Sequence, residues 1–256
     1  MADLNEMLAQ REWLLADGAT GTNYFAMGLQ SGEPPENWNL TNPDRVRELH
    51  RRFIEAGSDI VLTNTFGANP RRLMLHGAAE QTHEINQQAA LHARAEADAA
   101  GKPVLVAGSM GPTGDLLQPL GDVTQEEASA AFLKQARGLA EGGADVLWIE
   151  TLSSEEEAAA AVTAAAETGL PIIVTLSFDT GGRTMMGIKP QDWAGLSTRM
   201  PAPLSAYGAK CGVGAAELVA TVLGIAGAAA ASAVIVAKGN CGIPELIDGE
   251  IRYNGT

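Results

Sequence analysis

Short apolar segments recur along the chain and predict a series of buried β-strands. Their residues are apolar at consecutive positions rather than at alternating ones, which is typical of parallel strands that are covered on both faces. Many of them are β-branched, and turn residues flank most of the segments. Seven strands are predicted: Trp13 to Ala16, Asp59 to Thr63, Pro103 to Ala107, Asp145 to Ile149, Pro171 to Leu176, Pro203 to Ala206 and Ala233 to Ala237.

The stretches between most of these segments predict helices with recognisable ends. A helix over 43–56 follows a Thr41-Asn42 cap, and a helix over 125–141 follows Thr124, which forms a capping box with Glu127. Ser154 and Glu157 repeat this box before an alanine-rich helix. Glycine, the usual residue just past a helix end, precedes the next strand four times: Gly57, Gly101, Gly142-Gly143 and Gly169.

This strict alternation of strand and helix predicts an α/β fold with a parallel sheet. Polar, glycine-rich clusters follow nearly every strand, and convergence of so many strand ends favours a (β/α)₈ TIM barrel. A doubly wound sheet also satisfies the alternation, and residues 17–22 resemble its glycine-rich loop. That loop lacks the third glycine and a basic partner, so it is a weak signal.

Composition narrows the class of protein. The 256 residues are 46% hydrophobic, which suits a single domain over 1–256. The net charge of -14 excludes nucleic acid as a partner on electrostatic grounds. No apolar run reaches the ~18 residues of a membrane span, and the polar N-terminus is unlike a signal peptide, so no membrane association and a cytoplasmic location are predicted. Cys211 and Cys241 are too few for a disulfide framework.

Three strand ends carry polar residues that could bind a small molecule. Asp17 and Gly18 could accept a ligand ammonium and allow close approach to the backbone, or could simply form a tight turn. Asn64 could orient a polar ligand or cap its loop. Glu150 requires a cation, which would be either a substrate ammonium or a neighbouring Lys or Arg.

The cysteines and histidines do not by themselves define a metal site. Cys211 lies in a small-residue loop where a thiol is accessible, but one thiolate needs about three more ligands to complete a tetrahedron. The four histidines fall on or near early helices without a paired spacing. Cys241 is either a small buried residue or an additional ligand beside Cys211.

Six motifs in order make the chain similar to the homocysteine S-methyltransferase family over essentially its whole length. The resemblance is closest to bacterial betaine-homocysteine S-methyltransferases and more distant to the homocysteine-binding half of cobalamin-dependent methionine synthase. The motifs are Asp17 to Thr22, Thr63 to Phe66, Gly108 to Gly114, Trp148 to Thr151, Ser177 to Asp179 and Gly208 to Gly212.

The resemblance implies a barrel that holds one Zn²⁺ through three cysteine thiolates and transfers a methyl group from a betaine-like onium donor to homocysteine, giving methionine. Cys211 matches the first zinc ligand and, with Glu150, is implied in catalysis. Glu150 and the backbone around Asp17-Gly18 match the site for the homocysteine amino group, and Asn64 matches a pocket residue. Trp38 resembles the aromatic residue that faces a quaternary ammonium donor.

Two departures from the family pattern alter these expectations. Lys210 stands where the family usually has asparagine, which places a cation beside the implied metal ligand. The chain also stops before the eighth βα unit and its Gly-Gly-Cys-Cys motif, so a C-terminally incomplete barrel with weak zinc binding and little activity is predicted. The open strand edges of such a barrel favour a homo-oligomer. The alternative function is a catalytically impaired barrel that binds a small amino acid or ammonium compound, or that serves as a partner subunit.

Overall fold

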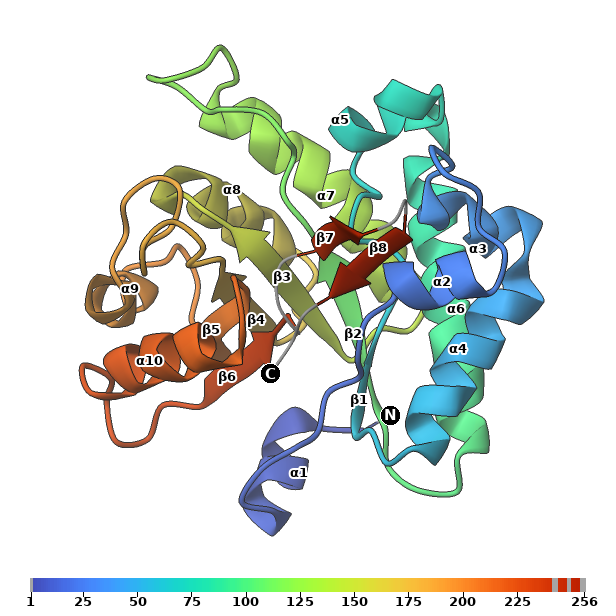
Figure 1. The fold of residues 1–256 in the computed structure, drawn as a ribbon, viewed down its shortest axis with the longest axis horizontal. Helices are drawn as coiled ribbons and strands as arrows, with labels where there is room; N and C mark the ends of the chain where they lie inside the picture. The colour runs from blue at the N-terminus through green and yellow to red at the C-terminus, as the bar shows by residue number, and fades with distance from the viewer. Residues whose placement is uncertain (1, 241–243, 248–249, 254–256) are drawn as a thin grey trace. The chain divides into compact units, whose positions relative to one another are not determined.

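The computed structural model describes residues 2–240, 244–247 and 250–253, the last two ranges through their backbone alone (Figure 1). The chain divides into two compact units, the first comprising 1–148 and 164–171 and the second 149–163 and 172–256. Strand β3 (Val146–Leu152) and helix α8 (Glu155–Ala166) each have residues in both units. The expectation of a single domain over 1–256 stays a prediction.

The first unit holds two parallel strands and most of the helices. Its strands β1 (Ile60–Leu62) and β2 (Leu105–Met110) pair directly, Val61 being the register partner of Val106. Its helical elements are α1 (Leu4–Gln10), α2 (Gly21–Ala26), η1 (Pro35–Asn37), α3 (Trp38–Thr41), α4 (Pro43–Glu55), α5 (Pro70–Leu73), η2 (Met74–His76), η3 (Ala79–Gln81), α6 (Thr82–Ala99) and α7 (Gln125–Glu141).

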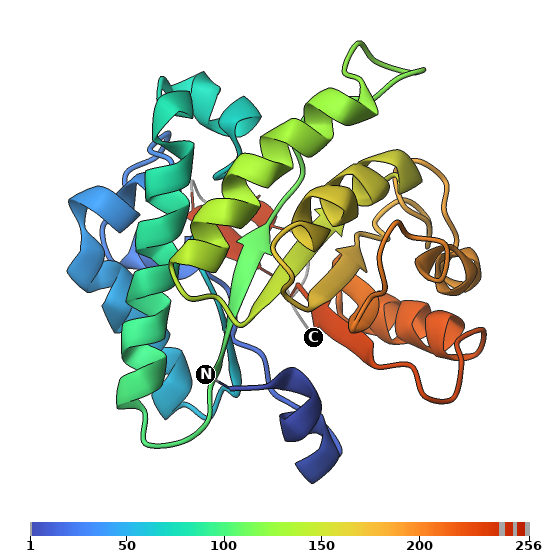
Figure 2. The same cartoon turned by 180° about the vertical axis from the view of Figure 1, so that it is seen from behind.

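Helices α4, α6 and α7 lie side by side, with α6 in the middle (Figures 1 and 2). Small residues permit the close contact between α6 and α7. A Cβ added to Gly138 would lie 2.6 Å from the carbonyl oxygen of His83, and one added to Gly142 would collide with that of Gln87. Glycine at these positions therefore lets the two helix backbones approach closely.

The second unit continues the alternation of strand and helix. Its elements after β3 and α8 are β4 (Ile172–Leu176), α9 (Pro190–Ser197), β5 (Ala206–Cys211), α10 (Ala215–Ala226), β6 (Ile235–Gly239) and the antiparallel pair β7 (Pro244–Ile247) and β8 (Glu250–Tyr253). Strands β4, β5 and β6 are parallel neighbours. Helix α10 contacts β5, β6 and α9 (Figure 1).

Strand order distinguishes the two fold classes that the alternation left open. The main strands are hydrogen-bonded in chain order, β1-β2-β3-β4-β5-β6. A doubly wound sheet reverses its order at a switch point, whereas a (β/α)₈ barrel adds each strand beside the previous one. The order is therefore that of part of a (β/α) barrel. The absence of an eighth unit stays a prediction.

Several local expectations are confirmed. Thr124 and Glu127 form both hydrogen bonds of the capping box before α7, and the Ser154 hydroxyl accepts from the Glu157 N–H at 3.1 Å. Gly57, Gly101, Gly143 and Gly169 all have positive φ after their helices. At the start of α4, by contrast, the Asn42 side chain makes no capping hydrogen bond.

Two of the predicted strands are wrong in place or extent. The segment 13–16 forms only an isolated bridge from Ala16 to Ile60, because the Asp59 carboxylate takes the Leu15 N–H in place of a backbone carbonyl. The segment 203–206 mostly precedes β5, which begins at Ala206. Pro203 lacks the N–H that a ladder requires, so the apolar run there is a loop. The β7–β8 pair was not predicted.

Two of the polar clusters that were predicted to follow strands lie within the strands instead. Glu150 and Thr151 belong to β3, and Lys210 and Cys211 are the last residues of β5. These strands are therefore longer at their carboxyl ends than their apolar cores indicate. Among the described residues, no helix is both long and apolar enough to cross a membrane.

Candidate functional site

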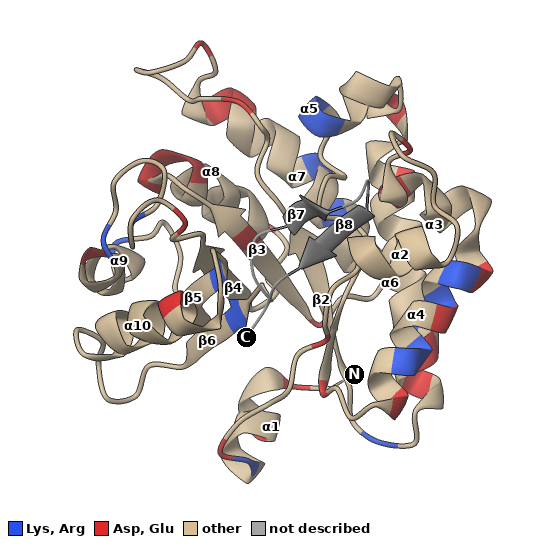
Figure 3. Ribbon diagram, in the orientation of Figure 1, with Lys and Arg blue, Asp and Glu red and all other residues tan. Residues whose placement is uncertain are grey.

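Glu150 and Lys210 form an ion pair in the second unit. Glu150 lies on β3 and Lys210 on β5, with β4 between them in the strand order, so the pair reaches across a strand. The side chain of Glu150 is 2% exposed and that of Lys210 is 16% exposed. Of the two cations that the sequence left open for Glu150, the structure supplies a neighbouring lysine. Figure 3 shows the acidic position on β3 and basic positions on β5 and β6.

Lys238 of β6 is the register partner of Lys210, and Gly239 is the partner of Cys211. Register partners on parallel strands present their side chains on the same face of the sheet. Lys238 was missed as a candidate because its neighbours Ala237 and Gly239 have no polar or reactive side-chain groups. The available signal was positional, since both lysines are the penultimate residues of their strands.

Thr151 and Cys211 share an unusual backbone conformation. Within the described part of the chain they are the non-glycine residues with positive φ, 65° and 66°. Their side chains meet, with 3.6 Å between Thr151 Oγ1 and Cys211 Sγ. Positive φ is strained for a β-branched residue such as threonine, and such strain clusters at functional sites. This places the predicted Cys211 in the same cluster as Glu150.

The metal expected from the resemblance was tested against the donor atoms present. Cys211 is a partly exposed free thiol, which is a suitable zinc ligand. Among the described residues, however, no group of three or more His, Cys, Asp or Glu side chains is placed to hold a metal ion. Cys241 lies outside the described residues. The described side chains therefore do not fit a zinc ion by themselves.

In the first unit, Asp17 is buried and already engaged with the backbone. Its carboxylate accepts the Leu62 N–H at 2.8 Å, and its own N–H donates to the Ile60 carbonyl at 2.9 Å. A Cβ added to the neighbouring Gly18 would lie 2.9 Å from the Phe53 ring, so a larger residue there would require that ring to move. Both the turn role and the ligand role considered for Asp17 remain compatible with this geometry.

Asn64 and Asn39 form a buried amide pair in the same unit. Asn64 donates through Nδ2 to the Pro35 carbonyl at 2.7 Å, and Asn39 donates to the Asn64 carbonyl at 2.8 Å. His92 contacts the Asn39 carbonyl at 2.9 Å. The Asn64 amide thus anchors the segment that carries η1 and α3.

Trp38 is 3% exposed and packs against Tyr24, Val46 and other apolar residues of the first unit. Its indole Nε1 donates to Glu33 at 3.1 Å. The guanidinium carbon of Arg45 lies 5.5 Å from the ring centroid, within the range of a cation–π interaction. The cation at the Trp38 ring is therefore a residue of the chain itself, Arg45.

His50 is a buried polar residue that the sequence did not single out. It lies on α4, is 2% exposed, and its Nε2 has no hydrogen-bond partner among the described residues. Burial lowers the pKa of His50 to about 4, with a smaller contribution from His92, while Asp17 and Glu96 oppose the shift. Burial, reinforced by Asp17 and Glu36, raises the pKa of Tyr24. Both groups are therefore neutral near pH 7.

Stability is expected to fall in mild acid because of His50. Its pKa is below the unfolded value of 6.5, so the unfolded chain binds more protons as pH falls from about 6.5 towards about 4. Between about pH 7.5 and about pH 5 this contribution amounts to about 2 kcal/mol. Urea unfolding at both pH values should show that His50→Gln removes this much of the wild-type loss. An equal loss in both proteins would refute the assignment.

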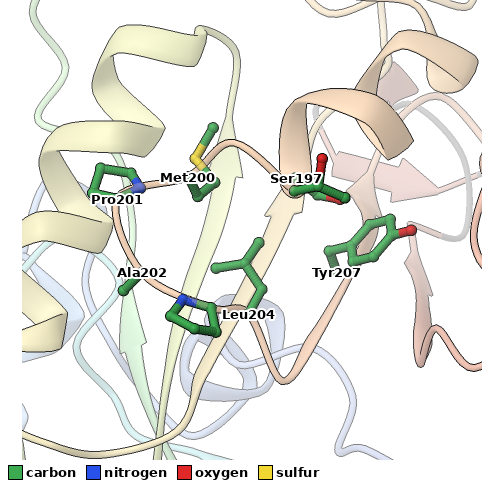
Figure 4. A pocket seen from close by; sticks show the side chains of 8 residues that line it. Ser197, Met200, Pro201, Ala202, Leu204 and Tyr207 are labelled. Carbon is green, nitrogen blue, oxygen red and sulfur yellow. The ribbon is translucent and has the colours of Figure 1, made fainter.

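A cavity of about 360 Å³ lies elsewhere in the second unit (Figure 4). Met200 and Leu204 of the α9–β5 loop line it together with Tyr207, near the start of β5. Lys210 and Cys211 are at the other end of that strand. Function in barrel-like folds resides at the carboxyl ends of the strands, so this cavity is not assigned to the candidate chemistry.

Comparison with known proteins connects these residues to a family. Residues 14–256 match the sequence profile described as "Homocysteine S-methyltransferase". The chain is 34% identical over 236 residues to a methionine synthase of Mycobacterium leprae and 32% identical over 231 residues to one of Mycobacterium tuberculosis. Each match covers 84% of this chain but only 19% of the relative, so the chain spans about a fifth of these enzymes.

Solved structures support the same architecture. The metallated form of the homocysteine methyltransferase MmuM from Escherichia coli superposes with a TM-score of 0.81 at 24% identity, covering 93% of this chain and 87% of that one. Its apo form gives a TM-score of 0.71 at 21% identity, covering 91% and 83%. At this level of identity the likeness establishes the fold alone.

Proposed function

Because this chain belongs to the homocysteine S-methyltransferase family, we propose that it binds homocysteine and accepts a methyl group onto its thiol from a betaine-like onium donor, giving methionine. The observation that carries the proposal is the cluster of Glu150, Thr151, Lys210 and Cys211 at the carboxyl ends of β3 and β5. Two of the family motifs, residues 148–151 and 208–212, supply these side chains, and the positive φ values of Thr151 and Cys211 lie at the same place.

The proposed step is an in-line displacement. The sulfur of homocysteine forms a bond to the methyl carbon while the carbon–nitrogen bond of the donor breaks, and the electron pair leaves with nitrogen. The thiol proton goes to solvent. The protein contributes by holding the two reactants in line, which lowers the entropic part of the activation barrier for methyl transfer.

We propose Glu150 as a contact of the homocysteine ammonium within the second unit. Within the first unit, Asp17 is proposed separately as an ammonium contact, Gly18 as the point of access to the backbone and Asn64 as a pocket residue. A buried carboxylate needs a cation, and Glu150 has Lys210 as its partner, so a substrate ammonium would share or replace that pairing. These contacts are independent proposals, and mutation of each residue tests that residue alone. Trp38 stays the proposed contact of the onium donor on the strength of the family resemblance, and an onium donor there would have to take the place of the Arg45 guanidinium at its ring.

Zinc and the role of Cys211 as its ligand stay predictions from the resemblance. When bound, such an ion lowers the pKa of a coordinated thiol. Metal analysis after dialysis against a mild chelator tests this, because about one retained ion per chain would indicate a complete site. Self-association through strand edges and the identity of the donor also stay predictions.

A second function is favoured by one observation. Lys210, which stands where the family usually has asparagine, pairs with Glu150 from within the chain, and this favours a catalytically impaired barrel. The two functions differ in turnover. Homocysteine binding without methionine formation, under any donor, would support the binding protein or partner subunit.

The proposed reaction predicts a specific effect at Asp17. Incubation with homocysteine and either glycine betaine or a sulfonium donor should yield methionine, detected by mass spectrometry. Asp17→Asn keeps an oxygen for the Leu62 N–H but removes the charge, so KM for homocysteine should rise about tenfold. Asp192→Asn, at an exposed position on α9, is the matched control. Unchanged KM in Asp17→Asn would remove Asp17 from the site.

A further inference from the structure

Glu36, in the first unit, is a buried carboxylate without a cation paired to it. It lies on η1 and is 6% exposed, and its Oε1 accepts the Gly67 N–H at 2.6 Å. Across the part of the chain that the structure describes, no Lys, Arg or His side chain forms an ion pair with it, and its Oε2 accepts no hydrogen bond. Burial of a carboxylate costs free energy unless a cation approaches it. Glu36 is therefore suited to a positively charged ligand group.

Arg72 places a positive charge close to this carboxylate without pairing with it. It lies on α5 (Figure 3), is half-buried, and has no ion pair among the described residues, whereas its neighbour Arg71 pairs with Asp115. A Cβ added to Gly67 would lie 2.8 Å from Glu36 Oε1 and 3.8 Å from Arg72 Nε. The two opposite charges therefore lie close to the same position.

Glycine at position 67 keeps that position free of a side chain. Gly67 does not have a positive φ, so its backbone conformation does not require glycine. The reason for glycine there is the closeness of Glu36. Gly114, in the loop after β2, also leaves room for Arg72, since an added Cβ would lie 3.2 Å from Arg72 Cδ and Nη1. A side chain at either position would crowd the charged groups.

Hydrogen bonds fix the segments that carry the two charges. Asn64 donates to the carbonyl of Pro35, the residue before Glu36, at 2.7 Å. Asn69 caps α5 by accepting the Arg72 N–H at 3.0 Å. Both asparagines follow β1, at the carboxyl end of the strand, where function resides in (β/α) barrels. The charges are thus held on the end of the first unit that carries the proposed pocket residue Asn64.

We propose that Glu36 and Arg72 bind a small zwitterion, Glu36 taking its cationic nitrogen and Arg72 its carboxylate. Opposite charges that are close but unpaired are bridged by a molecule that carries the complementary charges, and a guanidinium matches a carboxylate in both charge and geometry. This inference deepens the proposed function and rests on it. Homocysteine and a betaine-like donor are both zwitterions, so the chemistry is shared and experiment decides the source.

The experiment removes one charge at a time from the ligand and from the protein. Calorimetry on the purified chain would compare homocysteine with 3-sulfanylpropan-1-amine, which lacks the carboxylate, and with 4-sulfanylbutanoate, which lacks the ammonium. In a second set, glycine betaine would be compared with choline, which lacks the carboxylate, and with 3,3-dimethylbutanoate, which lacks the positive charge.

The two variants should show crossed effects within one of these sets. In Arg72→Met, affinity for the zwitterion and for the analogue without positive charge should fall about tenfold, while the carboxylate-free analogue changes by less than about twofold. Glu36→Gln keeps an oxygen for the Gly67 N–H and should instead weaken the zwitterion and the carboxylate-free analogue. Arg183→Met and Glu84→Gln, at exposed positions, are the matched controls. Melting curves verify folding, and either variant alone tests its half of the pattern.

The outcomes separate this inference from the proposed function. The set that shows the crossed effects identifies the zwitterion. Crossed effects without methionine formation under any donor would sustain the zwitterion site and sink the methyl transfer. Methionine formation in variants that weaken all three ligands of each set equally, or weaken none, would overturn the zwitterion site. Failure of every ligand to bind the wild-type chain would overturn it as well.

Discussion

Replacing Glu150 with alanine is expected to lower the free energy of unfolding by about 3 kcal/mol, because Lys210 is then left largely buried without its carboxylate. Such a deletion is severe because the desolvation cost of the remaining ammonium is no longer offset by this ion pair. Replacing both partners at once, as Glu150→Leu with Lys210→Met, should bring stability back to within about 1 kcal/mol of wild type. Urea unfolding of wild type, Glu150→Leu, Lys210→Met and the double variant measures the coupling.

The exposed pair Glu48–Arg52 on α4 supplies the matched control. Its side chains are 37% and 58% exposed, so Glu48→Ala should change stability by less than about 0.5 kcal/mol. If Glu150→Ala were no more destabilising than Glu48→Ala, the Glu150–Lys210 pair would not exist in solution. For all variants of this pair, homocysteine affinity is compared only among proteins that are folded under the assay conditions, so that loss of binding is not confused with loss of structure.

Replacing Gly208 with alanine is expected to destabilise the chain by about 3 kcal/mol or more, since the added Cβ would collide with the backbone of Val236. Gly208 and Val236 are register partners on β5 and β6. A backbone neighbour cannot rotate away as a side chain can, so the two strands must separate. Thermal and urea unfolding measure the effect.

Gly195→Ala on α9 is the control for this change. Nothing lies within 4 Å of a Cβ at Gly195, and alanine favours a helix, so a gain of about 0.5–1 kcal/mol is expected. A Gly208→Ala protein as stable as wild type would contradict the close approach of β5 and β6. The same approach sets Lys210 beside Lys238.

The strained residues beside these charges suit a site that must hold its groups in fixed positions. Thr151 and Cys211 adopt positive φ on strands that flank β4, and their side chains meet. Strain of this kind persists only where surrounding structure enforces it. The strand ladders on both sides and the Glu150–Lys210 pair provide that enforcement within the second unit.

Local features of this protein could be predicted from its sequence, because their causes act between residues close in the chain. The α7 helix begins at its predicted capping box, since Thr124 and Glu127 are only three residues apart. Gly57 and Gly169 end helices with positive φ as expected, because glycine adopts that conformation without a steric penalty. The buried strand β4 was recognised from its run of mostly apolar, β-branched residues.

The partners of the charged site residues were decided by tertiary structure. The sequence predicted that Glu150 needs a cation, either a substrate ammonium or a Lys or Arg of the chain. It could not identify that cation as Lys210, which is 60 residues away. The pairing of Lys210 with Lys238 depends on the register of β5 against β6, where a slip of one residue reverses every side chain. The segment 13–16 failed as a strand because the distant Asp59 carboxylate took its N–H. Such outcomes depend on which segments meet in space, and short-range sequence patterns do not determine those contacts.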